Sequence, residues 1–295
     1  MYNQIASNKR RTAYLFIVFS LVVIAVGWGL SYYFNDQLIL WVAVIIAVVQ
    51  SWVSYFYADK ISLAVAGAKP ATPQQFPELN RLVENLAITI GQPKPPVYII
   101  NDPSPNAFAT GRDPKHAAIA VTTGLLEVLE KRELEGVLAH EFSHIANRDI
   151  LVMTVCVTLV GTIVLISDIF TRSWLWGSHD DSDSKASGIV MIISLALAIL
   201  APLFAQLIQL AISRRREYLA DASGALMTRF PEGLASALAK IEKYERPMKA
   251  ANRATAHLYI NEPFGVDEKK VSWLGTIFST HPAISDRIKK LNEMI

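Results

Sequence analysis

Four long stretches of the sequence contain no charged residue, and they constrain the possible folds more than any other feature. They cover residues 12–34, 37–58, 150–167 and 186–213. An α-helix rises about 1.5 Å per residue, so roughly 20 residues cross a hydrocarbon core of about 30 Å. The first, second and fourth stretches reach that length, and the third is near its lower limit. They predict four transmembrane helices, with a buried helix of a globular domain as the alternative for residues 150–167.

The composition supports a membrane protein. The 295-residue chain is 52% hydrophobic and 18% charged, whereas an average soluble domain has about 25% charged residues. We therefore expect the lipid bilayer to be a partner. A net charge of +2 argues against a nucleic-acid-binding protein. The single cysteine, Cys156, excludes an intramolecular disulfide and a metal site made of several thiolates.

Basic residues at the ends of the apolar stretches predict the orientation in the membrane. With four transmembrane helices, residues 35–36 and 168–185 form the external loops and hold two of the 28 basic residues. Basic triplets at residues 9–11 and 214–216 lie directly at membrane boundaries. The positive-inside rule therefore places both termini in the cytoplasm. The first stretch is too long for the apolar part of a signal peptide, so we expect it to remain as an anchor.

The two polar regions, residues 59–149 and 214–295, fall on the same side of the membrane and can form one domain. Apolar periodicity and turn residues predict the elements within them. The second region is expected to be helical throughout. The first is expected to contain a helix at 74–90, short strands at 97–100 and 117–122 with a turn-rich loop at 101–112 between them, and a helix from Glu130 onward.

The strongest chemical signal is the sequence His140-Glu141-Phe142-Ser143-His144. On a helix, residues i and i+4 share a face, so His140 and His144 can present two imidazoles to one metal ion. Glu141 is adjacent to that face, where its carboxylate can act as general base on a water molecule activated by the metal. Two ordinary histidines on a helix surface are the alternative interpretation of this motif alone.

A third ligand is needed, because catalytic zinc has three protein ligands and one open position. A further histidine six residues after His144 is excluded, since that position is Ile150. A glutamate on a later helix remains possible, and Glu217 is followed four residues later by Asp221. We expect Glu217 to bind the metal and Asp221 to accept a hydrogen bond from the far nitrogen of a ligand imidazole. The alternative is an acidic pair on a solvated helix face.

Several motifs of this chain have counterparts in one protein family: His140 to His144, Ser213-Arg214, Glu217-Tyr218, Ala220-Asp221, Asn106 to Gly111 and Thr280-His281-Pro282. They resemble those of the HtpX family, the heat-shock membrane metalloproteases of bacteria, in the same broad group as the CaaX prenyl endopeptidases. The resemblance covers nearly the whole chain, including the positions of the four apolar stretches. It implies a zinc endopeptidase with one zinc ion per chain. It also implies that the enzyme lies in the bacterial inner (plasma) membrane, with its catalytic domain in the cytoplasm, and removes misfolded membrane proteins.

The resemblance also implies a strand edge that binds peptide substrates. Asn106-Ala107 and the strand at 116–123 resemble the edge that holds extended substrates in this protease group. An open strand edge offers backbone hydrogen bonds whatever the substrate sequence. An ordinary loop and strand is the alternative. The residues expected to contact the peptide are Asn106, Ala107, His116, Ala118 and Ala120.

His281 resembles a family position near the active site. In that position it can stabilise the oxyanion of the tetrahedral intermediate as a catalytic residue. It also directly precedes Pro282 and the helix expected at 283–294, so a helix-start residue is an equal alternative.

Other functional classes fit the sequence less well. An ATP-driven protease needs a Gly-x4-Gly-Lys-Ser/Thr phosphate loop, which the chain lacks, so we expect no nucleotide. An intramembrane protease of the site-two type would place the histidine pair inside a transmembrane helix, not after a charged stretch. A transporter should carry polar or ionisable groups within its transmembrane helices, and these stretches contain only scattered Ser, Thr and Gln and none of Asp, Glu, Lys, Arg or His. A scaffold with a structural zinc is the other non-enzyme alternative.

We therefore predict a mainly α-helical membrane protein. Four transmembrane helices would carry a cytoplasmic α+β domain, a gluzincin-like zinc protease with a small β-sheet. Between His144 and Glu217, a transmembrane hairpin would leave the cytoplasmic side and return to it, so that both ligand helices meet at the membrane surface. The expected segments are a two-helix anchor (1–58), the first catalytic part (59–149), the transmembrane hairpin (150–213) and the second catalytic part (214–295).

Overall fold

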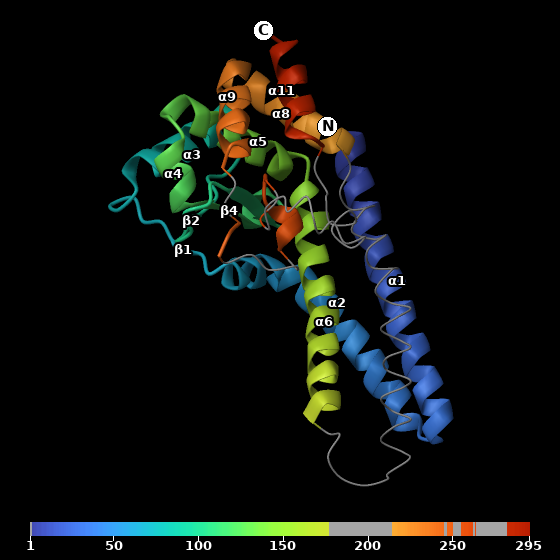
Figure 1. Ribbon diagram of the computed structural model, residues 1–295. Coiled ribbons are helices and arrows are strands. Elements are labelled where there is room, and N and C mark those ends of the chain that lie inside the picture. Colours follow the sequence, from blue (N-terminus) through green and yellow to red (C-terminus); the bar gives the residue numbers. More distant parts are fainter. Residues whose placement is uncertain (1, 177–213, 245–246, 250–254, 262, 264–281) are drawn as a thin grey trace.

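The computed structural model describes residues 2–176, 214–244, 247–249, 255–261, 263 and 282–295 (Figure 1). Long helices project from a globular part that holds a small sheet and the shorter described helices. Both termini lie at the globular end. The described chain is thus mainly helical with one small mixed sheet, in agreement with the coarse architecture that the sequence predicts.

The first two apolar stretches form a helical hairpin. Helices α1 (Tyr2–Phe34) and α2 (Gln37–Val65) are joined by a turn of two residues. Asn35 adopts a left-handed backbone with φ of 53°, and the Asp36 carboxylate caps α2 by accepting a hydrogen bond from the Leu38 N–H at 2.8 Å. Both helices are long and apolar enough to cross a membrane.

The third apolar stretch lies in α6 (Asp149–Trp176), so the prediction of a helix there is confirmed. The fourth, residues 186–213, lies outside the described residues. Helix α6 follows α5 (Lys131–Ala146) after two residues, at an angle of 85°. This bent pair has the length and apolarity of a broken membrane span. The first turns of α6 pack on α1, in a buried cluster that includes Leu15, Phe19, Leu151, Val155 and Leu159.

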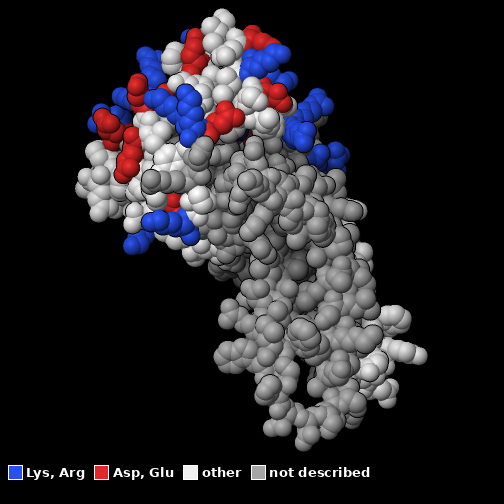
Figure 2. All heavy atoms as spheres, viewed as in Figure 1, with Lys and Arg blue, Asp and Glu red and all other residues white. Residues whose placement is uncertain are grey.

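Beyond these contacts, the two uncharged stretches of the helical hairpin, residues 12–34 and 37–58, expose many apolar side chains. The large exposed side chains include Trp28, Trp41, Ile45, Val48 and Trp52. Continuous apolar surface of this extent is typical of contact with lipid or another protein and not with water. Figure 2 shows the complementary distribution of charge: Lys, Arg, Asp and Glu side chains gather at the globular end, and the described atoms visible at the far end of the helices are uncharged.

The sheet has four strands in the order β1-β2-β4-β3. They are β1 (Lys69–Pro70), β2 (Val97–Ile100), β3 (Ala107–Gly111) and β4 (Ala117–Thr122). Strand β4 pairs parallel with β2 and antiparallel with β3. The predicted strands at 97–100 and 117–122 are confirmed, and the first helix of this region, α3 (Pro77–Thr89), begins three residues later than expected because Pro77 takes its first turn.

Two sequence expectations about the sheet are wrong. The segment 101–112 is not only a loop, because its second half forms strand β3, whose side chains are all buried. Strand β4 is also not an open edge, since β2 and β3 occupy both of its sides. Hydrogen bonding between β3 and β4 explains both errors: the partner of each strand cannot be read from local periodicity.

Helix α5 is the central element of the globular part. It lies between the sheet on one side and α8 (Arg214–Thr228) and α9 (Pro231–Glu242) on the other, with α11 (Ile284–Asn292) behind them. Its apolar residues Val137, Leu138, Ala139 and Phe142 are fully buried. The Glu133 carboxylate accepts hydrogen bonds from the Glu130 N–H and from Lys240 on α9, which fixes the start of the helix. The short elements α4 (Thr123–Val128), η1 (Pro114–His116) and η2 (Ala256–Leu258) connect these layers.

Candidate metal centre

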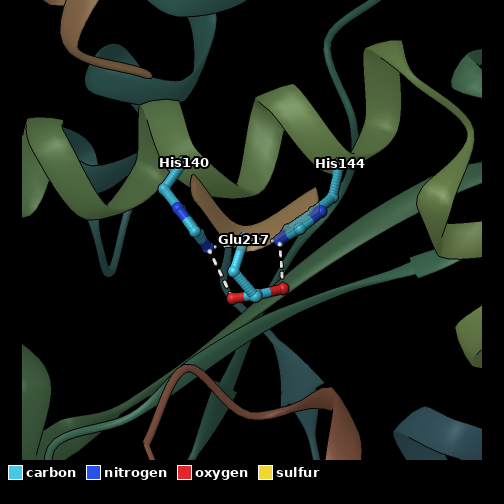
Figure 3. A group of neighbouring side chains, drawn as sticks. All are labelled: His140, His144 and Glu217. Carbon is cyan, nitrogen blue, oxygen red and sulfur yellow. Dashed lines mark hydrogen bonds and ion pairs between the residues drawn. The ribbon is translucent and has the colours of Figure 1, made fainter. Parts of the chain in front are cut away.

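Three side chains converge at the contact between α5 and α8. His140 and His144 lie one turn apart on α5 and point at the Glu217 carboxylate of α8 (Figure 3). The two Nε2 atoms are 3.1 Å apart. Glu217 Oε1 is 3.5 Å from Nε2 of His144, and Oε2 is 3.8 Å from Nε2 of His140. All three side chains are buried, and within the described part of the chain they are the one group of this kind close enough to hold a metal ion.

The spacing of these atoms is of the size that a shared metal ion requires. Zinc binds imidazole nitrogen and carboxylate oxygen at about 2.0–2.2 Å, so two ligands of a tetrahedral site are roughly 3.3–3.5 Å apart. The two Nε2 atoms are 3.1 Å apart, and each lies 3.5 or 3.8 Å from a different oxygen of Glu217, so the separations lie close to that range. Two imidazoles and one carboxylate also leave one tetrahedral position open, which is the donor set of a catalytic rather than a structural zinc site.

Each imidazole is oriented by its own carboxylate. His140 Nδ1 lies 2.9 Å from Asp221 Oδ1, as the sequence predicts for that aspartate. His144 Nδ1 lies 3.1 Å from Asp149 Oδ2, a contact that the sequence did not suggest. A carboxylate on Nδ1 holds the proton there and turns the unprotonated Nε2 toward the metal. The two rings are therefore oriented with Nε2 toward the Glu217 carboxylate.

The Asp221 carboxylate is held by a buried arginine from the C-terminal helix. Arg287, which has 0% exposure, donates from Nε and Nη2 to the two oxygens of Asp221 at 2.9 and 2.7 Å. Burial alone would raise the pKa of Asp221, but the charge of Arg287 and the hydrogen bonds outweigh it and lower the pKa to about 2. Asp221 is thus a carboxylate at any physiological pH and remains a strong acceptor for His140.

The environment of His144 is strongly anionic. Burial by itself lowers the pKa of this imidazole, but the hydrogen bond with Asp149 and the charge of Glu217 outweigh burial and raise the pKa to about 9. Without a metal, the His144 imidazole is therefore positively charged at neutral pH, with a proton on both ring nitrogens. A bound cation would replace the proton on Nε2, and the same carboxylates would then stabilise the cation.

Glu141, the expected general base, is buried on α5. In the sequence it directly follows His140 and lies three residues before His144. Its charge contributes to the raised pKa of His144, which places its carboxylate within electrostatic reach of the ligand cluster. His281, the other expected catalytic residue, lies outside the described residues.

The residues expected to hold substrate are found in three different environments. His116 is exposed at the end of η1 and pairs with Asp113 at 2.9 Å. Ala118 and Ala120 lie in β4, whose two sides are already paired, so they present no free strand edge. Asn106 directly precedes β3 and Ala107 is its first residue; β3 is one of the two outer strands of the sheet, and both residues are buried. There Ala107 O accepts a hydrogen bond from Ile260 N–H at 3.1 Å.

A glycine allows α8 to approach α5 closely enough for Glu217 to reach the histidines. A Cβ atom at Gly224 would lie 2.9 Å from the His140 backbone nitrogen and 3.2 Å from its Cα. These are backbone atoms of a buried helix, and they cannot move without displacing the His140 imidazole as well. The close packing of the two helices therefore sets the distance between the histidines and the carboxylate.

Gly224→Ala is expected to lower the stability by about 1–3 kcal/mol, the usual cost of overpacking, and to weaken metal binding. Thermal unfolding and zinc affinity measure the two effects. Ser223→Ala is the matched control. Ser223 is half-buried on the same helix, one residue earlier, and the substitution introduces the same alanine side chain. Unchanged stability and zinc affinity in Gly224→Ala would contradict the role given to this contact.

Comparison with known proteins places the chain in a family. The model of peptidase family M48 matches residues 73–295, which include both ligand helices. The chain belongs to peptidase family M48. This M48 metallopeptidase is similar to curated proteins of three bacteria that are named protease HtpX homolog. Each alignment covers 100% of this chain and 98% of the relative. The identities are 50% for Caldanaerobacter subterraneus subsp. tengcongensis, 49% for Thermoanaerobacter pseudethanolicus and 44% for Tropheryma whipplei strain Twist.

A solved structure shows the same fold. The crystal structure of S. mikatae Ste24p matches with a TM-score of 0.51 and 18% identity. The match covers 99% of this M48 peptidase and 67% of the Ste24p chain. At this level of identity, the likeness concerns the arrangement of the helices and the sheet.

Three residues around the centre were missed in the sequence. Arg287 had a detectable signal: it lies among Ile284, Ile288 and Leu291 on the apolar face of α11, where a charged side chain needs a buried partner. Asp149 stands directly before an uncharged stretch, and a single acidic residue in that place indicates no partner. Asn8, which binds Asp149, is an ordinary asparagine near the N-terminus and gave no signal.

Proposed function

We propose that this M48 metallopeptidase is a zinc-dependent endopeptidase integrated in the membrane. The observation that carries the proposal is the buried cluster of His140, His144 and Glu217, with Glu141 beside it on the same helix. Its two imidazoles and one carboxylate, each imidazole backed by a carboxylate, suit zinc better than the hard cations calcium and magnesium, which prefer all-oxygen sites.

Each residue of the cluster has a distinct task in peptide hydrolysis. A bound zinc ion would lower the pKa of water to about 7 and polarise the scissile carbonyl group. The Glu141 carboxylate takes a proton from the attacking water and then passes it to the leaving amine. Asp149 and Asp221 orient the ligand imidazoles with Nε2 toward the Glu217 carboxylate. His281 is a further candidate, as a donor to the oxyanion.

An outer strand of the sheet is a suitable place for the peptide. A protease that accepts many sequences needs contacts with the peptide backbone, and an edge strand provides them. Strand β3 has this position. Asn106 and Ala107 at its start are buried, and the Ala107 carbonyl accepts a hydrogen bond from the Ile260 N–H, so a peptide that pairs there would displace residues 260–261 from the strand.

The membrane helices indicate substrates that are also in the membrane. We infer four transmembrane helices, both termini and a gluzincin-like catalytic domain in the cytoplasm, and a location in the bacterial inner membrane. The ligand helix α5 lies two residues before α6, so the chemistry takes place next to a membrane helix. Polypeptide segments close to the membrane, including those of misfolded membrane proteins, are the substrates that this arrangement favours.

The test uses the full-length protein purified in detergent. We expect about one zinc ion per chain by elemental analysis and cleavage of casein that stops when a chelator removes the metal and returns when zinc is added. Chelator-insensitive cleavage, or a purified protein that neither contains nor binds zinc, would contradict the proposal.

A further inference from the structure

The start of the first long helix reaches the metal centre. Asn8, near the beginning of α1, has 2% exposure, and its side-chain amide lies at the junction between α5 and α6. Its Nδ2 group donates to Asp149 Oδ1 at 2.7 Å and to the Asn147 carbonyl at 3.0 Å. Asn147 caps the end of α5 and Asp149 begins α6, so one amide binds both sides of the bend.

These contacts form a continuous path to a metal ligand. The Asp149 carboxylate uses Oδ1 for Asn8 and Oδ2 for Nδ1 of His144. Arg216, one residue before the ligand Glu217, also donates to Asp149 Oδ1 and to Asn8 Oδ1, both at 3.3 Å. Asn8 thus links the carboxylate behind one metal ligand to the helix that carries another.

We propose that Asn8 is a positioning residue for the metal centre, acting on His144 through Asp149. The inference rests on the proposed metal site and assigns α1 a task beyond anchoring. Asp149 is the first residue of α6 and follows the left-handed Arg148, with φ of 58°, so its backbone alone does not fix its carboxylate. The short Asn8 hydrogen bond fixes the rotamer in which Oδ2 faces His144. Outer contacts of this kind change the metal affinity of a site by about 10–100-fold.

Arg216 cannot take over this role alone. Its guanidinium is 3.3 Å from Asp149 Oδ1, whereas the Asn8 amide is at 2.7 Å. Arg216 also needs Asn8 Oδ1 as a second acceptor. Removal of the Asn8 amide therefore loosens both contacts to the same carboxylate oxygen.

The experiment measures zinc affinity of the full-length chain in detergent by competition with a chromogenic chelator. Asn8→Leu, which removes the amide, is expected to lower zinc affinity roughly 10-fold. Asn8→Asp keeps the shape of the side chain but places a second carboxylate against Asp149. This variant is expected to lower zinc affinity further than Asn8→Leu does. The visible absorption spectrum of the cobalt-loaded variants should change as well, because the His144 ring is less firmly oriented. Thr12→Val is the matched control: Thr12 is equally buried on α1 but binds only the Asn8 carbonyl, so zinc affinity should stay within about twofold.

A double-mutant cycle separates positioning from general damage to the fold. In an Asp149→Asn background, Asn8→Leu should have little further effect on zinc affinity, because its target is already altered. The proposal would be overturned if the effects of Asn8→Leu and Asp149→Asn on zinc affinity were fully additive. It would also be overturned if Asn8→Asp had the zinc affinity and the cobalt spectrum of the wild type. A wild-type protein that binds no zinc would overturn the metal site itself, and that result is distinguishable because it does not depend on Asn8.

Discussion

Replacing Glu141 by glutamine is expected to lower casein cleavage by about 10²–10⁴-fold, while zinc content stays at the wild-type level. The amide has the shape of the carboxylate but cannot accept a proton from water at neutral pH. Glu141 is not among the three clustered ligands His140, His144 and Glu217, so its replacement leaves the donor atoms in place. Cleavage assays on zinc-loaded protein, with elemental analysis of the same sample, measure both quantities.

Glu135→Gln provides the control for this variant. Glu135 lies on the same helix in a half-buried position, and its replacement removes the same charge. It should cleave casein at close to the wild-type rate. Cleavage by Glu141→Gln within about tenfold of wild type would exclude Glu141 as the general base, whereas loss of zinc would mean that Glu141 supports the metal instead.

Arg287→Met is expected to destabilise the fold by about 3–5 kcal/mol, because it leaves the Asp221 carboxylate buried without its charge partner. Methionine fills much of the space that the arginine stem occupies, so the loss of charge dominates over a cavity. The same change should weaken zinc binding, since Asp221 holds His140. Chemical denaturation of the metal-free protein measures the first effect, and chelator competition measures the second.

The neighbouring residue Lys289 offers a matched control for the arginine. Lys289 is exposed on the same helix, α11, and Lys289→Met removes one positive charge without touching a buried carboxylate. Its stability should remain within about 0.5 kcal/mol of wild type. Equal effects of the two substitutions would show that the Arg287–Asp221 pair does not support the centre.

The sequence predicted the parts of the site that depend on local spacing. The helical repeat brings His140 and His144 to one face, and Glu217 and Asp221 to another, because each pair is four residues apart. The helix that carries the histidines was also predictable, as were strands β2 and β4, because their residues alternate or repeat in recognisable patterns.

Contacts between distant segments were not predictable in the same way. Asn8 lies 141 positions from Asp149, and Arg287 lies 66 positions from Asp221. Their partners follow from how the helices pack and not from any local pattern. The open edge was assigned to β4 for the same reason: the strand that covers it, β3, has small residues and follows a Pro-rich turn, so it resembled a loop.

The sharp bend between α5 and α6 has a consequence for the direction from which a substrate arrives. Because the angle between them is 85°, α5 lies nearly perpendicular to α6. His144 is five residues before Asp149, about one and a half helical turns from the bend. A peptide that lies along α5 would therefore run across the axis of α6 and not alongside it. A polypeptide would reach the histidine pair close to where α6 begins, and its direction there would follow α5 and not the long helices.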